Sequence, residues 1–360
     1  MKHLVFCLIC LIGIIVTGCS HTSSITEQEL TENTRDVNYS VIYYIHADAD
    51  YLYHNSDGKP IQANSRVLST ALEVGEAARS GEVFIYYQRP ERKILGLFPR
   101  KSSRFYQYKN GLLINHMKYR HEDKREPFLT TEAQLMTKYR GQNRTDSHQT
   151  YFLYFGHEIP LGNNKGYHRS LPGIDVNTFS FATGIQNFLK TDDERFSLVA
   201  LSTCNNGTPE MAKLLTPFTH TLLASPQNLH LSHIDSDAIQ LLETNPDISS
   251  LQLGRFLGEF TFQRLDTTVH TTISLALYDL KTVSTYIKSL SAYTAVDKVS
   301  ERPLLFKDNI DCAKIHPFDP EAYTQGIEIW YKPARFGRQS AQLHSGWGCK
   351  PVMKHVGSKK

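Results

Sequence analysis

Five short apolar runs constrain the fold of this chain more than any other feature. They cover residues 41–45, 83–87, 151–155, 196–201 and 220–225, and polar residues end each of them. Helix formers fill residues 64–80, so the chain begins with a strand, a helix and a second strand. Largely apolar runs of this length are typical of strands buried on both faces. Their alternation with helices predicts an α/β fold around a mostly parallel sheet.

Two of these runs end at residues that can do covalent chemistry. Residues 151–155 lead into Gly156-His157-Glu158, and residues 196–201 lead through Ser202 and Thr203 to Cys204. Open α/β sheets place their ligands at the carboxyl ends of their strands. The 47 residues from His157 to Cys204 are enough for one crossover helix between neighbouring parallel strands.

A thiolate with a histidine beside it can attack an amide carbonyl, and the imidazole then protonates the leaving amine. We therefore predict that Cys204 is a nucleophile and His157 its general acid and base. The backbone N–H groups of Glu158 and Cys204 would form the oxyanion hole. The alternative for a thiol in apolar surroundings is a buried structural cysteine.

The amino terminus has the pattern of an export signal. A basic start, Met1-Lys2-His3, precedes thirteen apolar residues (4–16), which is signal-peptide length and short for a membrane span. Val16-Thr17-Gly18-Cys19 resembles a bacterial lipobox, which implies removal of residues 1–18 and lipid on Cys19. An ordinary secretory signal is the alternative. Ser20, where an aspartate would favour inner-membrane retention in some bacteria, favours the outer membrane.

Three cysteines remain after Cys7 and Cys10 leave with the signal and Cys19 is lipidated. They are Cys204, Cys312 and Cys349. In an oxidising compartment an odd count suggests one pair and one thiol, so Cys312 and Cys349 are a possible disulfide. The alternative is that all three are reduced and buried. A net charge of +3 gives no reason to expect a nucleic-acid partner.

Residues 88–127 depart from the strand–helix alternation. They hold eleven Lys and Arg against four Asp and Glu, and Lys109-Asn110-Gly111 separates two alternating runs. This pattern predicts a β-hairpin. Its basic residues could contact an anionic substrate or the lipid surface. Alternatively, they only prevent its edge strand from pairing with another sheet edge.

Further elements are expected on both sides of Cys204. Helices are predicted over residues 131–139, 179–189 with a cap at Asn177 or Thr178, 209–215, 233–242, 249–265 and 280–290. Strands are predicted over residues 268–278 and 323–331.

A strand that ends in His, followed by a strand that ends in Cys, resembles the cysteine peptidases that include caspases, gingipains and clostripain. The clostripain family is the best match, because its first strand also runs into an Asp-rich turn, here Asp48-Ala-Asp50. Its cysteine also precedes a glutamate by six residues, as Cys204 precedes Glu210. Its next strand ends in a serine, as residues 220–225 end in Ser225, and a later strand resembles residues 273–280.

The resemblance implies a caspase-like α/β/α sandwich over residues 40–295, with a Cys204–His157 dyad. A signal peptide (1–18), a flexible tether (19–39) and a C-terminal extension (296–360) complete the expected organisation. The hairpin would be an insertion. Clostripain itself needs calcium, so calcium is implied by resemblance only; the sequence requires no cofactor and contains neither EF-hand nor zinc spacing.

Two residues depart from the family pattern. Glu158 follows the histidine where the family usually has glycine, and Ser202 stands where it often has the aspartate associated with cleavage after Arg or Lys. Ser202 and Ser225 are candidate substrate-binding residues. Asp48, Asp175 or Asp235 would have to supply the charge for a basic substrate residue.

The sequence thus predicts a lipid-anchored endopeptidase acting on proteins or peptides, with self-processing between His157 and Cys204 at Lys165, Arg169, Lys190 or Arg195. A lipoprotein that keeps the fold as a binding or scaffolding module is the alternative, motivated by Glu158 and Ser202. In both cases lipid on Cys19 would attach the protein to a bilayer. The oligomeric state is not predicted.

Overall fold

The described residues of the computed structural model all lie in the second of the two compact units of the chain, Asp36–Lys360. They are residues 36–48, 52–54, 59–90, 92–94, 98–100, 102–121, 123, 125–141, 144–162, 173–191, 193–227, 229, 233–271, 273–284, 326–332, 342–344 and 349–351.

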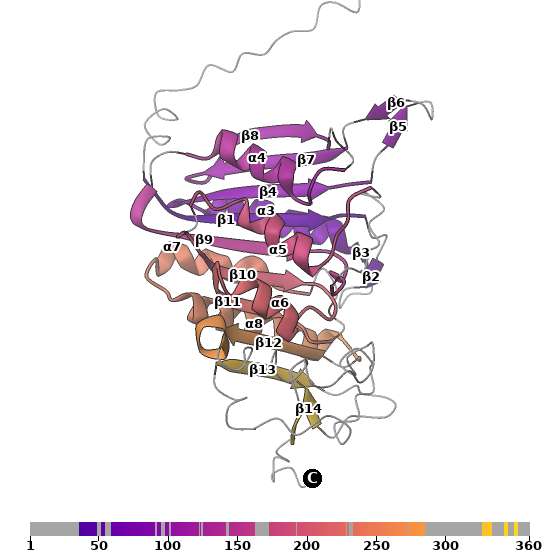
Figure 1. Ribbon diagram of the computed structural model, residues 1–360, viewed down its shortest axis with the longest axis vertical. Helices are drawn as coiled ribbons and strands as arrows, with labels where there is room; N and C mark the ends of the chain where they lie inside the picture. The colour runs from indigo at the N-terminus through magenta and orange to yellow at the C-terminus, as the bar shows by residue number, and fades with distance from the viewer. Residues whose placement is uncertain are drawn as a thin grey trace, which may run out of the picture. The chain divides into compact units, whose positions relative to one another are not determined.

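A nine-stranded sheet forms the centre of this unit, in the order β13-β12-β11-β10-β9-β1-β4-β7-β8 (Figure 1). Its five middle strands are parallel: β11 (Thr219–Ala224), β10 (Phe196–Ser202), β9 (Arg144–Phe155), β1 (Val37–His46) and β4 (Gly81–Gln88). They contain the five apolar runs, so the predicted parallel core is confirmed. β12 (Ile273–Asp279) and β13 (Ile327–Lys332) extend one side antiparallel.

The predicted hairpin extends the other side of the sheet. β7 (Ser103–Lys109) pairs antiparallel with β4 and with β8 (Leu112–Tyr119). Asn110 and Gly111 between them have φ angles of 51° and 80°, the left-handed pair that a two-residue type I′ turn requires. The hairpin therefore extends the central sheet, with β8 as the edge strand.

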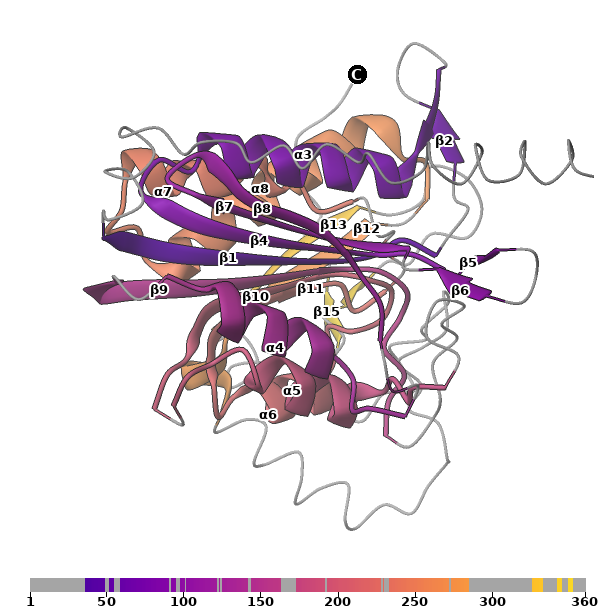
Figure 2. The ribbon, with the colours of Figure 1, turned by 90° about the horizontal axis from the view of Figure 1, so that it is seen from above.

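Helices cover both faces of the sheet, as Figure 2 shows. One face carries α4 (Thr130–Tyr139), α5 (Thr178–Gln186) and α6 (Pro209–Leu215), and the other carries α3 (Ala63–Ala77), α7 (Leu241–Thr244) and α8 (Ser250–Thr268). Successive strand residues point to opposite faces, so Ile42 and Tyr44 of β1 join one apolar cluster while Val41 and Tyr43 join the other. The predicted α/β/α sandwich is confirmed.

Several helix ends follow the capping residues in the sequence. Asn177 forms a capping box with Ser180 at the start of α5, Thr208 caps α6, and Ser249 caps α8. The predicted helix at 233–242 is instead a 3₁₀ turn, η1 (Ser236–Gln240), followed by the short α7. α7 ends at Thr244 because Asn245 precedes Pro246, and residues before proline disfavour helix.

The remaining predicted elements are only partly described. α8 runs to Thr268, so β12 begins five residues later than the predicted strand. Residues 280–284 are helical and 326–332 contain β13, whereas 285–290 and 323–325 lie outside the described residues. β1 begins at Val37, inside the predicted tether.

Three two-stranded pairs were not predicted from the sequence. They are β2 (Leu52–His54) with β3 (Pro60–Gln62), β5 (Arg92–Ile94) with β6 (Phe98–Arg100), and β14 (Gln342–His344) with β15 (Cys349–Pro351). No helix among the described residues has the length and apolar character to cross a membrane. The predicted signal peptide and Cys19 lie outside these residues.

Candidate active site

β9 and β10 bring His157 and Cys204 to the same edge of the sheet. The two strands are parallel neighbours, and Phe155 pairs with Ser202 in their register. His157 and Cys204 each stand two residues beyond that pair, and both side chains are partly exposed. The crossover between them contains α5, as the 47-residue spacing predicted.

A buried asparagine ties the two strand ends together. The Asn206 Oδ1 accepts from the backbone N of Ile159 at 3.0 Å, and its Nδ2 donates to the Ile159 carbonyl at 2.7 Å. The Thr203 hydroxyl also donates to Asn206 Oδ1, at 2.5 Å. These bonds fix the loop carrying His157 against the loop carrying Cys204. Sequence reasoning missed Asn206; its only signal was an amide side chain two residues after the candidate nucleophile.

Glu158 and Asn205 form a second link, nearer the surface. The Asn205 Nδ2 donates to Glu158 Oε2 at 2.8 Å, and Asn205 itself has a left-handed φ of 55°. Its backbone N donates to the Gln227 carbonyl at 2.8 Å. Among the residues that the structure describes, no acceptor is bonded to the backbone N–H of Glu158. That N–H is the donor predicted for the oxyanion hole.

Cys204 retains its thiol. Its Sγ donates to the Leu229 carbonyl oxygen at 3.3 Å, so the segment after β11 passes beside the sulfur. The predicted Cys312–Cys349 disulfide cannot be placed, because Cys312 and the side chain of Cys349 lie outside the described residues.

His157 is held by a carboxylate from β1. Its Nε2 lies 3.0 Å from Asp48 Oδ1; the His157 side chain is 39% exposed, whereas that of Asp48 is fully buried. The contact with Asp48 raises the pKa of His157, against a smaller opposing effect of burial. Burial alone would raise the pKa of Asp48, but its contacts with His157 and His46 hold that pKa well below its usual range.

Asp48 was a candidate for binding a basic substrate residue, and the structure places its carboxylate between two imidazoles instead. His46 Nε2 lies 3.3 Å from Asp48 Oδ2, and both side chains are fully buried. His46 is the last residue of β1 and one of sixteen histidines in the chain, and the structure buries its side chain against Asp48.

The two candidate substrate-binding serines are buried at the same edge. The Ser202 hydroxyl accepts from the backbone N of Ile234 at 3.2 Å. The Ser225 hydroxyl donates to the Ser274 carbonyl at 2.5 Å. These contacts hold the chain that follows β11.

The other acidic residues named from the sequence have separate places. Asp235 Oδ2 accepts from Arg264 Nε at 2.7 Å, and Asp175 is exposed before α5. Glu210 in the first turn of α6 accepts from the Thr178 hydroxyl at 2.6 Å, which links α6 to α5.

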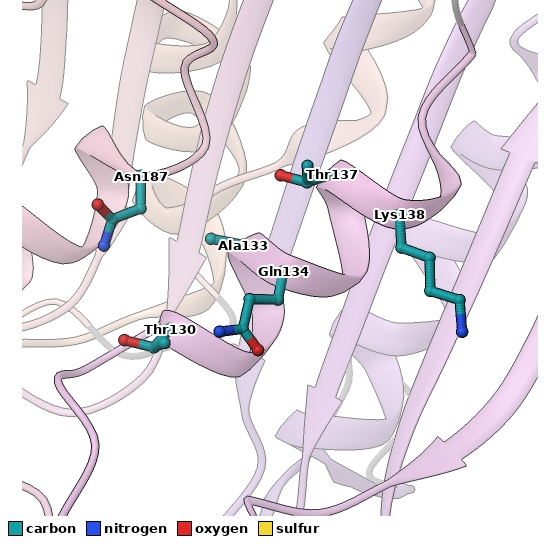
Figure 3. Close-up of a pocket in the computed structure, with 6 residues that line it drawn as sticks. All are labelled: Thr130, Ala133, Gln134, Thr137, Lys138 and Asn187. Carbon is teal, nitrogen blue, oxygen red and sulfur yellow. The ribbon is translucent and has the colours of Figure 1, made fainter.

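A cavity lies away from the sheet edge that carries Cys204 and His157. It has a volume of about 450 Å³ and is lined by α4 residues and by Asn187 at the C-terminal end of α5. Figure 3 shows its lining residues Thr130, Ala133, Gln134, Thr137, Lys138 and Asn187. Its lining contains neither Cys204 nor His157, so it plays no part in the candidate site. Within the described part of the chain, no three His, Cys, Asp or Glu side chains gather to hold a metal.

Comparisons with known proteins show the fold. No protein-family model and no curated protein sequence matches the chain. Among solved structures, a secreted C11 cysteine protease from Bacteroides thetaiotaomicron, called iotapain, has a TM-score of 0.53 at 11% identity, covering 88% of this chain and 92% of that one. An inactive zymogen C11 protease from Parabacteroides distasonis has a TM-score of 0.53 at 11% identity, covering 89% and 90%. The chain thus has the fold of C11, clostripain-family proteases.

Proposed function

We propose that this chain is a cysteine endopeptidase in which Cys204 is the nucleophile and His157 the general acid and base. The observation that carries the proposal is the arrangement of a partly exposed thiol and a partly exposed imidazole at adjacent strand ends. The imidazole is held by a buried carboxylate 3.0 Å away. A nucleophile, a base and a group that orients the base are the parts that amide hydrolysis needs.

Each proton in the reaction has a donor and an acceptor. His157 Nε2 faces Asp48, so Nδ1 is the nitrogen that exchanges protons with Cys204 and the substrate. The Cys204 thiolate attacks the scissile carbonyl carbon, and the oxyanion accepts hydrogen bonds from the N–H groups of Glu158 and Cys204. The C–N bond then breaks as imidazolium gives its proton to the amine. Water, deprotonated by His157, releases the acid from the thioester.

The substrates we propose are peptides. One of the C11 protease structures of similar fold, from Bacteroides thetaiotaomicron, was determined with an irreversible peptide inhibitor; its TM-score is 0.52 at 11% identity. Ser202 lacks the charge that would select a basic residue, and its hydroxyl already accepts from Ile234. A preference for Arg or Lys before the cleaved bond would therefore have to come from an acidic residue other than the one that Ser202 replaces.

A peptide library and a thiol-directed peptide probe test the proposal. Wild-type protein should cleave members of the library and be labelled at Cys204. Cys204→Ala should abolish both, and His157→Ala should abolish cleavage. Hydrolysis that persists in Cys204→Ala, or a folded wild-type protein that the probe does not label at Cys204, would refute the proposal.

A binding or scaffolding module is the second candidate. The bridge from Glu158 to Asn205 favours it, because the carboxylate spans the two loops beside the nucleophile where the resemblance expects glycine. In that case the library would remain intact with wild-type protein, and a bound peptide would be recovered unchanged.

We further propose that the protein is anchored to a membrane, with the outer membrane favoured, through lipid on Cys19. The support is the apolar stretch of residues 4–16 and the Val16-Thr17-Gly18-Cys19 ending. Cells grown with labelled palmitate should yield a labelled protein, whereas Cys19→Ala should yield an unlabelled one. An unlabelled wild-type protein would contradict the anchor and leave the peptidase proposal untouched.

Self-processing between His157 and Cys204 completes the proposed function. That interval contains Lys165, Arg169, Lys190 and Arg195. One protein of similar fold is described as an inactive zymogen, which supports the idea that such chains are made in a precursor form.

A further inference from the structure

The carboxylate of Asp48 lies between two imidazoles, only one of which the proposed reaction uses. Asp48 Oδ1 is 3.0 Å from His157 Nε2, and Oδ2 is 3.3 Å from His46 Nε2. His46 is the last residue of β1, and Asp48 stands two residues beyond it. His157 stands two residues beyond the end of β9. The strands are parallel neighbours with Ile45 paired to Phe155, so the three groups meet at one level of the sheet.

Burial makes an ionised Asp48 unfavourable unless His46 and His157 compensate its charge. The side chains of Asp48 and His46 are both fully buried. A buried carboxylate loses its hydration, so the two imidazoles that face Asp48 stabilise its ionised form. Of the two imidazoles, only that of His157 reaches solvent, with 39% of its side chain exposed.

His46 has an acceptor on one ring nitrogen and a hydroxyl on the other. Its Nε2 faces Asp48, and its Nδ1 lies 3.4 Å from the Tyr154 hydroxyl. A neutral imidazole with its hydrogen on Nε2 can donate to Asp48 and accept from Tyr154. The edge of the Tyr44 ring packs against His46, with ring centroids 6.0 Å apart and planes at 86°. His46 is thus fixed by hydrogen bonding and by packing.

We propose that Asp48 is a positioning residue for His157, and that His46 in turn positions Asp48. The inference rests on the proposed peptidase function for its kinetic consequences, but not for the geometry. Asp48 fixes which nitrogen of His157 faces the thiol and stabilises the imidazolium that protonates the leaving amine. His46 keeps the buried carboxylate at the correct angle.

The direction of the pH effect follows from the same contacts. Asp48 raises the pKa of His157, so the imidazolium survives to higher pH than in an isolated histidine. The titratable groups facing Asp48 are His46 on β1 and His157 after β9, with Tyr44 on β1 and Tyr154 on β9 behind them. Burial raises the pKa of both tyrosines well above the usual value, so neither ionises near neutral pH.

Asp48→Asn tests whether Asp48 positions His157. The matched control is Asp123→Asn, because Asp123 is exposed in the connection between β8 and α4. In Asp48→Asn, kcat should fall about 100-fold while KM changes little, as expected for a group that acts through the general acid. The alkaline limb of kcat/KM should move down by about one pH unit. Asp123→Asn should have the kcat and the pH profile of the wild type. An unchanged pH profile in Asp48→Asn would overturn the proposal.

An NMR titration of His157 separates this proposal from the peptidase proposal. In the full-length Cys204→Ala protein, the His157 imidazole should titrate at higher pH than in Cys204→Ala/Asp48→Asn. That difference is expected whether or not the wild-type protein cleaves peptides. Equal titration midpoints in the two proteins would refute the role of Asp48 even in an active peptidase.

His46→Gln and His46→Leu test whether His46 positions Asp48. The Gln amide can keep a donor near Asp48 Oδ2, whereas Leu removes the donor. We expect Gln to retain most of the wild-type kcat and Leu to lose about as much as Asp48→Asn, with rates normalised to folded protein by near-ultraviolet circular dichroism. Equal kcat and equal pH profiles in the two folded variants would show that His46 does not act through Asp48.

Discussion

At the scale of single residues, the candidate site is built by short polar side chains that bond to backbone groups of neighbouring loops. Asn206 bonds to both backbone groups of Ile159, and Ser202 accepts from Ile234. Buried polar groups of this kind are stable only when they are paired, so each of them specifies one loop arrangement.

Glu158 provides a first prediction at this scale. Glu158→Ala removes the carboxylate that accepts from Asn205 Nδ2 and should lower the free energy of unfolding by about 1 kcal/mol, measured by urea denaturation. Glu158→Gln keeps an acceptor oxygen and should lose less. Peptidase activity should persist in both variants. Activity that rises steeply in Glu158→Ala would instead mean that this carboxylate obstructs the substrate.

His121 gives a second prediction, on stability against pH. Its Nε2 lies 3.2 Å from the buried Glu132, and its Nδ1 contacts Glu126. Burial alone lowers the pKa of His121, but the two carboxylates outweigh it and raise the pKa from 6.5 to about 10. The stabilisation is therefore complete below pH 6.5 and lost as pH rises towards 10.

Thermal unfolding between pH 6.5 and 10 should show this loss in the wild-type protein, and His121→Gln should flatten the dependence. His116→Gln is the control, because His116 is exposed on the edge strand β8. A His121→Gln profile parallel to that of the wild type would show that His121 does not carry the effect.

At the scale of elements, sequence pattern predicted the parts that depend on local chemistry. The apolar runs became β1, β4, β9, β10 and β11, and the Asn110-Gly111 turn specified the β7–β8 hairpin. Strand order and the pairing of Asp48 with His157 depend on contacts between distant segments, which local periodicity does not contain. Asp48 was noticed for its charge, but its role as a histidine partner needed the register of β1 against β9.

The close approach of β9 to β1 yields a prediction about Gly156. A Cβ at this position would lie 2.9 Å from the His46 Cβ and 2.9 Å from the Tyr154 Cε1. Gly156→Ala should therefore displace His46 or Tyr154 and reproduce the loss of kcat expected for His46→Leu, with a lower melting temperature. Gly162→Ala is the contrasting variant: among the described residues no atom lies within 4 Å of its Cβ, although its φ of 60° adds some backbone strain.

An unchanged kcat and pH profile in a folded Gly156→Ala protein would mean that the contact between β1 and β9 does not govern the site. Gly162→Ala should cost some stability through backbone strain alone and leave the pH profile as in wild type.

At the scale of the whole sheet, the five parallel strands separate two ends with different chemistry. Their carboxyl ends carry Asp48, His157 and Cys204, whereas Lys190 and Arg195 precede the amino end of β10. β10 has seven residues, so at about 3.3 Å per residue its first and last residues are about 20 Å apart. A folded chain therefore cannot bring Lys190 or Arg195 to its own Cys204 without unpairing β10.

This separation decides where self-processing should occur. Lys165 and Arg169 follow Gly162, whose backbone N donates to Glu210 at 2.8 Å near the carboxyl end of β10. We expect cleavage within one molecule to fall after one of these two residues, and mass spectrometry of incubated wild-type protein should find the new terminus there. Lys165→Ala/Arg169→Ala should block it, while Lys190→Ala/Arg195→Ala should not. A terminus after Lys190 or Arg195, formed at a rate independent of protein concentration, would mean that β10 leaves the sheet before processing.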